Sequence, residues 1–465
     1  MEDTTYFFYD LETSGLDPRK DRIMQFAGIR TDTEFNQIGE PVNILVKLAN
    51  DTLPSPGAIN VTGITPQMTQ LDGLSEPEFC KFVANDIFTP GTVEIGYNSI
   101  HFDDEHMRYT FYRNFYEPYE WQWKDGRSRW DLLDVVRMVR ALRPQGINWP
   151  VNEDGKPNNR LENLTKENNL PHEHAHDALS DVEALISVTK LVKEKQPKLF
   201  NYLFNLRNKN LVKQLFKFDL KSPLVHTSGR IPSTYWHTSV VLPIKLSSNG
   251  QSAIVFDLRQ DINELLEREK KEKDFSWGVA VREIAFNRCP CVAPIGVLDG
   301  ESEKDQTGWQ RIGLSKDDFD KNLRALQEKG EGLINHLVKW FEKKKDSFEK
   351  SSDVDAQLYD SFIPNSDKFK IKDVRERNAN ELADFHPIFE DARMDELLLR
   401  YKGRNFPNSL DENEQKKYEK YRIERLKSQE KSFVDEIERL KDTMDPGIIE
   451  DLLLWYQSLA ASDYE

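Results

Sequence analysis

The stretch Tyr6-Phe7-Phe8-Tyr9-Asp10-Leu11-Glu12-Thr13-Ser14-Gly15 places two carboxylates at the end of a short apolar run. Such a run predicts a buried β-strand, and residues i and i+2 of a strand point to the same face. Asp10 and Glu12 can therefore hold one cation between them. We expect a strand over Thr5–Asp10, with the acidic pair at the strand end, where an α/β fold exposes its site.

Two further segments carry side chains of the same chemistry. Asn98-Ser99-Ile100-His101-Phe102-Asp103 follows a second apolar run, and His176-Asp177-Ala178-Leu179-Ser180-Asp181 spaces an imidazole and a carboxylate by about one helical turn. Each segment alone is common in proteins with no metal site. Together they supply four carboxylates and one imidazole, which suffices for two cations and a general base.

The three segments, in this order, resemble the DEDDh exonucleases of the ribonuclease H-like fold. Other segments along nearly the whole chain resemble the bacterial exonuclease I family: Thr62-Gly63-Ile64-Thr65-Pro66, Ser128-Arg129-Trp130-Asp131, Gly146-Ile147-Asn148-Trp149-Pro150, Asp355-Ala356-Gln357-Leu358-Tyr359 and Arg404-Asn405-Phe406-Pro407. The resemblance implies a 3′–5′ exonuclease that degrades single-stranded DNA to 5′-mononucleotides and takes part in DNA repair and recombination.

The resemblance also implies a role for each site residue. Asp10 bridges two Mg²⁺ ions, for which Mn²⁺ can substitute, because oxygen ligands select hard cations. Glu12 and Asp181 hold the ion that orients the attacking water, and Glu12 also contacts the substrate. Asp103 supports the other ion through its water shell. His176 is the general base, since an unperturbed imidazole can accept a proton near neutral pH.

Two alternatives at the metal site stay open. Asp104 and Glu105 directly follow Asp103, and only the family pattern selects the first of the three acids. The alternating histidines of His172-Glu173-His174-Ala175-His176 could instead present imidazoles to zinc. No cysteine and no further histidine cluster lies nearby in the sequence, which favours the hard-cation site.

The net charge of −16 argues against a nucleic-acid partner when it is taken as a single number. The charge is unevenly distributed, however: residues 197–345 are basic overall, and both flanking segments are acidic. One run of basic residues has only Asp219 among it: Lys198, Arg207, Lys209, Lys213, Lys217, Lys221, Arg230 and Lys245. Such a run is usually a solvated face, but beside a phosphodiesterase-like segment it favours contacts with DNA phosphates, with Lys209 and Lys213 as candidates.

Aromatic residues offer stacking partners for the bases of a single strand. The candidates are Tyr112, Phe115, Tyr116, Tyr119, Trp121, Trp123 and Trp130. We expect at least two of them to touch bases, and we assign Arg129 and Trp130 to the substrate site. The choice of DNA rests on the resemblance. An exoribonuclease that trims RNA with the same catalytic set is the alternative, and a catalytically inactive scaffold is opposed by the intact set.

The resemblance further implies a protein partner, the acidic C-terminal tail of single-stranded-DNA-binding protein. Arg143, Tyr202 and the basic cluster near Lys221 are the expected dock, although the basic residue at Lys221 is displaced by one position from the family pattern. We expect a monomer in the cytoplasm without membrane contact. The acidic start of the chain, the absence of an apolar run long enough for a membrane span and the three cysteines, expected to be reduced, support that location.

The predicted architecture is α/β with three domains. Residues 1–196 form a ribonuclease H-like mixed-sheet exonuclease domain, residues 197–345 an SH3-like domain that contains a β-barrel, and residues 350–465 a C-terminal helical domain. In the middle domain we expect strands at Ser239–Leu246, Ala253–Asp257 and Gly278–Ala285. In the last domain we expect helices at Gln415–Lys441 and Pro446–Ala460.

Overall fold

The computed structural model describes residues 4–172, 177–299, 306–345 and 350–461. The chain forms two compact units. The first contains residues 1–128, 173–183 and 350–465, and the second contains residues 129–172 and 184–349. The three predicted domains divide the sequence differently, because the C-terminal helices belong to the same compact unit as most of the N-terminal segment.

A five-stranded mixed sheet organises the N-terminal segment. Its strand order is β3 (Val42–Leu45), β2 (Ile23–Thr31), β1 (Thr5–Thr13), β4 (Thr92–Gly96) and β5 (Ser128–Asp131). Strand β1 is antiparallel to β2 and parallel to β4, which confirms the predicted mixed sheet. The expected end of the first strand at Asp10 was wrong. Strand β1 continues to Thr13, so Asp10 lies inside the strand.

Alternation along β1 separates its two faces. Phe7, Tyr9 and Leu11 are buried in one hydrophobic cluster with residues of α3 (Glu76–Phe82) and α4 (Asp103–Arg113). Because successive side chains of a strand point to opposite faces, Asp10 and Glu12 lie on the other face. The apolar residues therefore hold the strand in the core, and the carboxylates on the other face are available to bind a cation.

The first unit also contains two short helices that the sequence reasoning did not anticipate, α1 (Pro56–Thr62) and α2 (Pro66–Asp72). Each begins with an N-cap hydroxyl followed by proline, a combination that favours helix initiation: Ser55 caps α1 and Thr65 caps α2. The N-terminal part of α7 (Ala178–Lys195) belongs to this unit as well.

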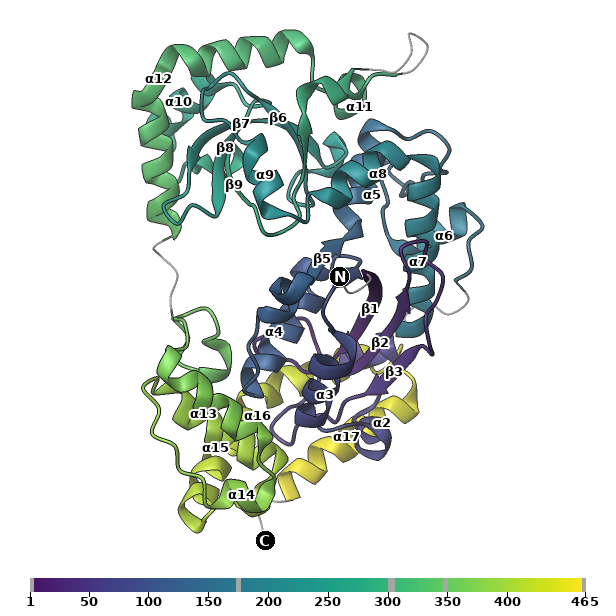
Figure 1. Cartoon of the computed structure of the whole chain (residues 1–465), viewed down its shortest axis with the longest axis vertical. Helices are drawn as coiled ribbons and strands as arrows, with labels where there is room; N and C mark the ends of the chain where they lie inside the picture. The colour runs from purple at the N-terminus through teal and green to yellow at the C-terminus, as the bar shows by residue number, and fades with distance from the viewer. Residues whose placement is uncertain (1–3, 173–176, 300–305, 346–349, 462–465) are drawn as a thin grey trace. The chain divides into compact units, whose positions relative to one another are not determined.

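The C-terminal region of the first unit is helical. Its helices are α13 (Asn365–Glu376), α14 (Ala379–Ala383), α15 (Arg393–Asn405), α16 (Glu412–Leu440) and α17 (Pro446–Ala461). Helix α16 contacts α1, and α17 contacts α1 and α2. Figure 1 shows α17, at the yellow end of the chain, beside α2. Ile59 and Ile64 share a hydrophobic cluster with Phe433 and Leu452, so these helices complete a core of the N-terminal segment.

Helix α4 is shared between two hydrophobic clusters. Met107 and Phe111 pack with the sheet, whereas Tyr109, Tyr112 and Phe115 pack with residues of α13 and α15. This explains why α4 is buried along nearly its whole length. A helix that begins at Asp103 is thus held on one side by the sheet and on the other by the C-terminal region.

The second unit contains an antiparallel five-stranded sheet. Its order is β10 (Cys291–Pro294), β6 (Leu224–Thr227), β7 (Thr238–Leu246), β8 (Ser252–Asp257) and β9 (Val281–Ala285). Three of these strands match the predicted ones within a few residues, while β6 and β10 were not predicted.

The helices of this unit, apart from α7, are α5 (Leu132–Leu142), α6 (Leu161–Glu167), α8 (Pro197–Asn205), α9 (Lys209–Leu215), α10 (Ile262–Lys271), α11 (Gly308–Ile312) and α12 (Lys316–Lys345). Across the described residues, no helix combines the length and the apolar character needed to span a bilayer.

Candidate metal centre

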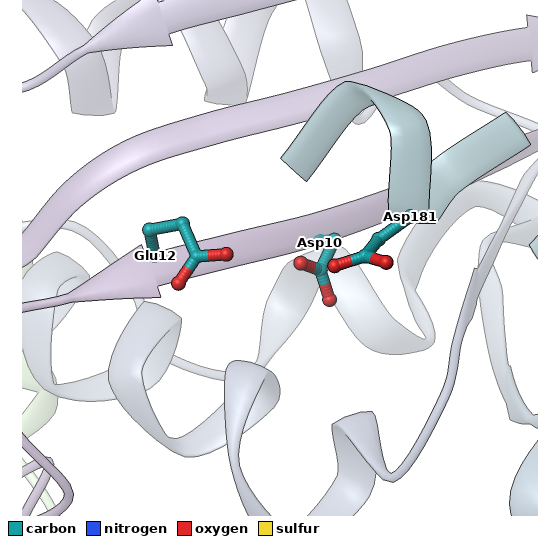
Figure 2. A group of neighbouring side chains, drawn as sticks. All are labelled: Asp10, Glu12 and Asp181. Atoms are coloured by element: carbon teal, nitrogen blue, oxygen red, sulfur yellow. The ribbon is translucent and has the colours of Figure 1, made fainter. Parts of the chain in front are cut away.

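Three of the predicted metal ligands lie together in the first unit. Asp10 and Glu12 extend from β1 and Asp181 from the first turn of α7, and Figure 2 shows the Asp181 carboxylate beside that of Asp10. One carboxylate oxygen from each residue lies within 4.8 Å of the others. Residues far apart in the sequence thus meet at one point on the open face of the sheet.

The neighbouring strand leaves room for this group. Asp10 lies opposite Ala27 of β2, whose small side chain cannot obstruct it, and Glu12 lies opposite Gln25. The pairing of β1 and β2 is irregular between Glu12 and Thr13. A bulge re-aims the side chains beside it, so the irregularity helps to set the direction of Glu12.

The electrostatics of the group favour a cation. Burial and, after it, the neighbouring Asp181 carboxylate together raise the pKa of Asp10 to about 8. Burial, followed by Asp10, Asp181 and Asp177, raises the pKa of Glu12 to about 9. Carboxylates that resist ionisation because they face one another are stabilised when a positive ion binds between them. An all-oxygen donor set fits Mg²⁺ or Mn²⁺.

Asp103 is not a member of the three-carboxylate group. It occupies the first turn of α4 and is 3% exposed. The adjacent Asp104 is held by two hydrogen bonds, from the Tyr9 hydroxyl (2.6 Å) and from the Gln122 amide (3.3 Å). Asp104 is thus engaged on the apolar side of β1, and the assignment of Asp103 to the metal site stays a prediction.

The predicted base, His176, lies outside the described residues, as does His174 of the alternative zinc segment. The Nδ1 atom of His172 is 3.0 Å from the Thr165 hydroxyl. Among the described residues, Asp10, Glu12 and Asp181 form the one group of three or more histidine, cysteine or acidic side chains that could hold a metal. Asp177, which sequence reasoning did not single out, contributes to the electrostatics of Glu12.

A hollow of about 520 Å³ lies between the turn that follows Glu12 and the helix that begins at Asp103. It is lined by Leu16, Asp17, Pro18, Arg19, Glu105 and Tyr109. Leu16 is 82% exposed, unusual for a leucine beside a buried site. Sequence reasoning did not single out Leu16, which directly follows the motif glycine.

The aromatic residues proposed for base stacking are mostly core residues. Trp130 is 1% exposed, and its ring packs edge-on against Phe200 and Phe204 in the second unit. Arg129 is also buried and donates a hydrogen bond to the Asn287 carbonyl (3.1 Å). Trp130 is thus a poor candidate for stacking, because its ring is enclosed by its own unit, and the assignment of Arg129 and Trp130 to the substrate site stays a prediction.

The rest of the aromatic run divides by exposure. Tyr112, Phe115 and Trp121 are buried, which removes them from the list of stacking candidates. Trp123 is 64% exposed, and Tyr119 is half-buried beneath the Arg108 guanidinium. Only the exposed and half-buried rings of this aromatic run are therefore accessible for stacking on bases.

The proposed phosphate and partner contacts lie in the second unit. Lys209, Lys213 and Lys221 are exposed, the first two on α9. The Arg143 guanidinium donates to the Leu142 and Val297 carbonyls, and the Tyr202 hydroxyl donates to the Val292 carbonyl. The structure thus leaves the lysines accessible, while Arg143 and Tyr202 already serve internal contacts.

Comparison with known proteins agrees with this geometry. Residues 7–189 match the family described as Exonuclease, residues 207–343 the Exonuclease I SH3-like domain, and residues 352–459 the Exonuclease I C-terminal domain. Exodeoxyribonuclease I of Haemophilus influenzae is 41% identical over 455 residues, which cover 95% of this chain and 94% of the relative. The chain belongs to the exodeoxyribonuclease I family. It is therefore an exonuclease.

Two solved structures extend the comparison to the whole fold. Escherichia coli exonuclease I in complex with a dA16 oligonucleotide superposes with a TM-score of 0.90 at 38% identity, covering 98% of this chain and 100% of the other. The zinc-ion-bound form of the E. coli exonuclease I complex with single-stranded DNA superposes with a TM-score of 0.90 at 37% identity, covering 99% and 100%. The SH3-like segment and the C-terminal helices of exodeoxyribonuclease I are both present in this chain.

Proposed function

We propose that this exonuclease degrades single-stranded DNA from its 3′ end, with Mg²⁺ as its natural cation and Mn²⁺ as a substitute. The observation that carries the proposal is the group of Asp10, Glu12 and Asp181 on a chain that matches the exodeoxyribonuclease I family through all three of its segments. Relatives whose structures contain single-stranded DNA support this substrate.

Each side chain of the site has its own role in the proposed reaction. Asp10, Glu12 and Asp181 would hold the cations, and Asp103 would orient water around one of them. Two bound divalent cations would supply an activated water and neutralise charge on the attacked phosphate and the leaving oxygen. His176 accepts the proton of that water, a role assigned from the sequence pattern. The last nucleotides of the strand enter the hollow beside Leu16 and Tyr109.

The test uses 5′-labelled single-stranded DNA, duplex DNA and RNA of one sequence, incubated with Mg²⁺, Mn²⁺, Zn²⁺ or EDTA. We expect stepwise shortening of the single-stranded DNA with Mg²⁺ or Mn²⁺, with 5′-mononucleotides as the product, and no shortening in EDTA. Asp181→Asn is the matched inactive control. Equal degradation of RNA would favour the exoribonuclease alternative, and activity with Zn²⁺ alone would contradict the choice of cation.

The general base has its own test. Because base catalysis is worth roughly 10²–10⁴-fold in rate, His176→Ala should lower turnover by that factor while DNA affinity changes little. The pH profile of the remaining activity should lose its limb near the imidazole pKa. An unchanged profile would place the base elsewhere.

The partner and the setting are further proposals. The exposed basic surface near Lys221, together with Arg143 and Tyr202, is our candidate dock for the acidic tail of single-stranded-DNA-binding protein. We also propose that the protein works as a monomer in the cytoplasm, where its three free cysteines stay reduced. Fluorescence anisotropy with the labelled tail peptide, comparing the wild type with Lys221→Glu, tests the dock.

A further inference from the structure

The turn after Glu12 is closed by Arg22, the residue that precedes β2. The Ser14 backbone N–H donates to the Arg22 carbonyl (2.8 Å), and the Arg22 N–H donates to the Ser14 hydroxyl (2.9 Å). This closure lies next to the irregular pairing between Glu12 and Thr13. The backbone of Arg22 therefore fixes the point at which the end of β1 that carries Glu12 meets β2.

The closed turn has little freedom to move. The Ser55 N–H donates to the Ser14 carbonyl (2.7 Å), and Ser14 is fully buried. A side chain at Gly15 would come within 2.5 Å of the Asp21 carboxylate. A displacement of Ser14 must therefore be transmitted through Thr13, the one residue that separates it from Glu12.

The guanidinium of Arg22 is held by charge alone. It is fully buried, and it lies 3.8 Å from the Asp51 carboxylate and 3.7 Å from that of Asp355. None of its three nitrogen atoms has a hydrogen-bond partner among the described residues. Because ion pairs at this distance lack directional bonds, the position of Arg22 depends on where the two carboxylates are held.

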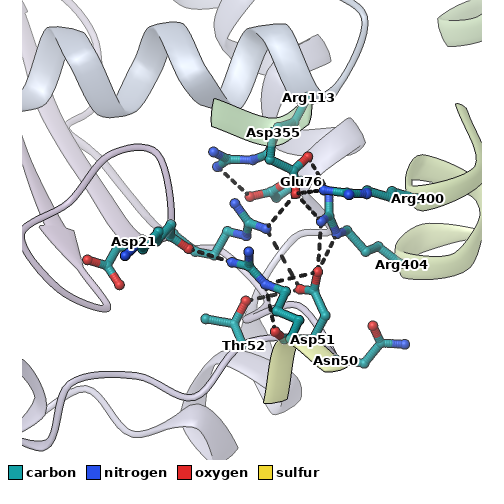
Figure 3. A network of polar contacts seen from close by, with 12 residues as sticks. Asp21, Asn50, Asp51, Thr52, Glu76, Arg113, Asp355, Arg400 and Arg404 are labelled. Atoms are coloured by element: carbon teal, nitrogen blue, oxygen red, sulfur yellow. Dashed lines mark hydrogen bonds and ion pairs between the residues drawn. The ribbon is translucent and has the colours of Figure 1, made fainter. Parts of the chain in front are cut away.

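The C-terminal helices hold both carboxylates. Figure 3 shows the guanidinium of Arg404 between Asp51 and Asp355, at 2.7 Å from Asp51 and in close contact with Asp355. Arg400 of α15 also pairs with Asp355 (3.2 Å), and Arg425 of α16 pairs with Asp51 (3.4 Å). Of the two carboxylates that fix Arg22, Asp51 lies near it in the sequence, whereas Asp355 and the arginines that hold both carboxylates lie more than three hundred positions away.

A second contact holds the turn, the hydrogen bond from the Ser55 N–H to the Ser14 carbonyl, and the segment around Ser55 is itself bound to helix α16. The Ser55 hydroxyl, which caps α1, donates to the Glu436 carboxylate of α16 (3.0 Å). Two residues earlier, the Leu53 N–H donates to the Gln429 side chain of α16 (2.7 Å). Both contacts that immobilise Ser14 are therefore anchored on the C-terminal region.

We propose that Arg22 is a positioning residue for the cation ligand Glu12, and that the C-terminal region takes part in divalent-cation binding through Asp355. The inference rests on the proposed assignment of Glu12 as a ligand. A network that only stabilised the fold would leave cation affinity unchanged in any variant that remains folded. Partners of metal ligands, in contrast, typically alter that affinity by about 10–100-fold.

The test compares two buried carboxylates of the C-terminal region. Asp355→Asn removes the charge that faces Arg22. Asp367→Asn removes an equally buried charge whose bonds go to the Glu390 and Asp391 N–H groups and to Lys370, all within the C-terminal region. A third variant, Ser14→Ala, removes the hydroxyl that accepts from Arg22 and leaves the ion pairs in place.

The readout is Mn²⁺ binding by isothermal titration calorimetry on the full-length protein without DNA, with thermal unfolding recorded in parallel. We expect Asp355→Asn and Ser14→Ala to raise the dissociation constant by about 10-fold or more, and Asp367→Asn to lower the melting temperature without changing cation affinity. Unchanged affinity in Asp355→Asn and Ser14→Ala overturns the proposal, as does an equal loss in Asp367→Asn. If Asp355→Asn does not fold, the Mn²⁺ affinity of Ser14→Ala decides. A raised dissociation constant supports the proposal, and an unchanged one overturns it.

Asp10→Ala distinguishes this proposal from the assignment on which it rests. If Asp10→Ala binds Mn²⁺ as the wild type does, the cation site itself is misplaced. If Asp10→Ala loses Mn²⁺ binding while Asp355→Asn and Ser14→Ala retain it, only the positioning role of Arg22 fails.

Discussion

Two groups of carboxylates in the first unit, half-buried in the metal centre and buried around Arg22, have opposite electrostatics. Burial alone would raise the pKa of every member. In the metal centre, facing carboxylates raise it further, to about 8 for Asp10 and about 9 for Glu12. In the network around Arg22, guanidinium groups outweigh burial and hold the pKa of Asp51 and of Asp355 well below the usual range. The neighbours, and not the depth of burial, decide whether a buried acid attracts a cation.

The two groups therefore contribute differently to stability. A cluster of like charges opposes folding until a cation binds, whereas a compensated network supports the fold at neutral pH. The carboxylates of the metal centre, which repel one another, lie on one face of β1. The network around Arg22, in which opposite charges compensate, lies at the turn that follows the same strand. Substitutions in the two groups should therefore have different effects on nuclease activity and on the stability of the fold.

The largest effect is expected for Asp10→Asn, which should abolish metal-dependent nucleotide release. Because the substitution also removes one of three facing carboxylates, it should raise the melting temperature in EDTA. Differential scanning fluorimetry and a nuclease assay measure the two effects, and the exposed Asp154→Asn is the control. A lower melting temperature in EDTA would show that Asp10 is not under repulsion.

Arg404→Met tests the opposite group. It leaves the Asp51 and Asp355 carboxylates buried beside fewer positive charges, and breaking a buried pair costs about 3–5 kcal/mol of unfolding free energy. The control is Lys372→Met, which breaks an ion pair whose partners are both 58% exposed and should cost only about 0–1 kcal/mol. Urea unfolding of both variants measures the difference. Equal losses would mean that the network is not a stabilising element.

An intermediate effect is expected in acid. The pKa of Asp355 is lowered on folding, so its contribution is present above the ordinary carboxyl pKa of about 3.9 and is lost as the pH falls toward the folded value. Asp355→Asn should therefore be less stable than the wild type at pH 7, and the gap should narrow on acidification below about pH 4. Urea unfolding at several pH values checks this. A gap that stays constant with pH would contradict the lowered pKa.

The smallest effect concerns a third kind of charge, the exposed lysines of α9 and its flank. Each phosphate contact on a single strand contributes about −0.7 to the slope of log affinity against log salt. Replacing Lys209, Lys213 and Lys217 with glutamine should flatten that slope by up to about 2 for long oligonucleotides and leave hydrolysis of very short ones unchanged. Lys270→Gln with Lys271→Gln is the control, because both residues pair with Glu267. An unchanged slope in the triple variant would remove α9 from the DNA path.

The metal centre was largely predictable from the sequence. Asp10 and Glu12 are linked by strand alternation, and Asp181 is linked to them by the family pattern. The mixed sheet followed from the same reasoning. The extension of β1 beyond Asp10 was not predictable, because the apolar run ends there and the irregular pairing depends on contacts of β2.

Long-range contacts explain what the sequence did not show. Trp130 looked available to DNA because its neighbours in sequence are polar, but its ring packs on Phe200 and Phe204 of helix α8. The contacts of Arg22 were not visible in the sequence, because the carboxylate of Asp355 that faces it lies more than three hundred positions away. Local patterns identify chemistry, whereas long-range contacts decide whether a side chain is accessible.

The sharing of one compact unit by the two ends of the chain has a consequence for synthesis. A ribosome that has completed the catalytic motifs has not yet made Asp355, Arg404 or Arg425, so the nascent Arg22 and Asp51 still lack most of their compensating charges. On this proposal, the contacts that fix the turn beside Glu12 are complete only when the last quarter of the polypeptide has emerged. Truncated translation products that lack it should therefore bind divalent cations more weakly than the full chain.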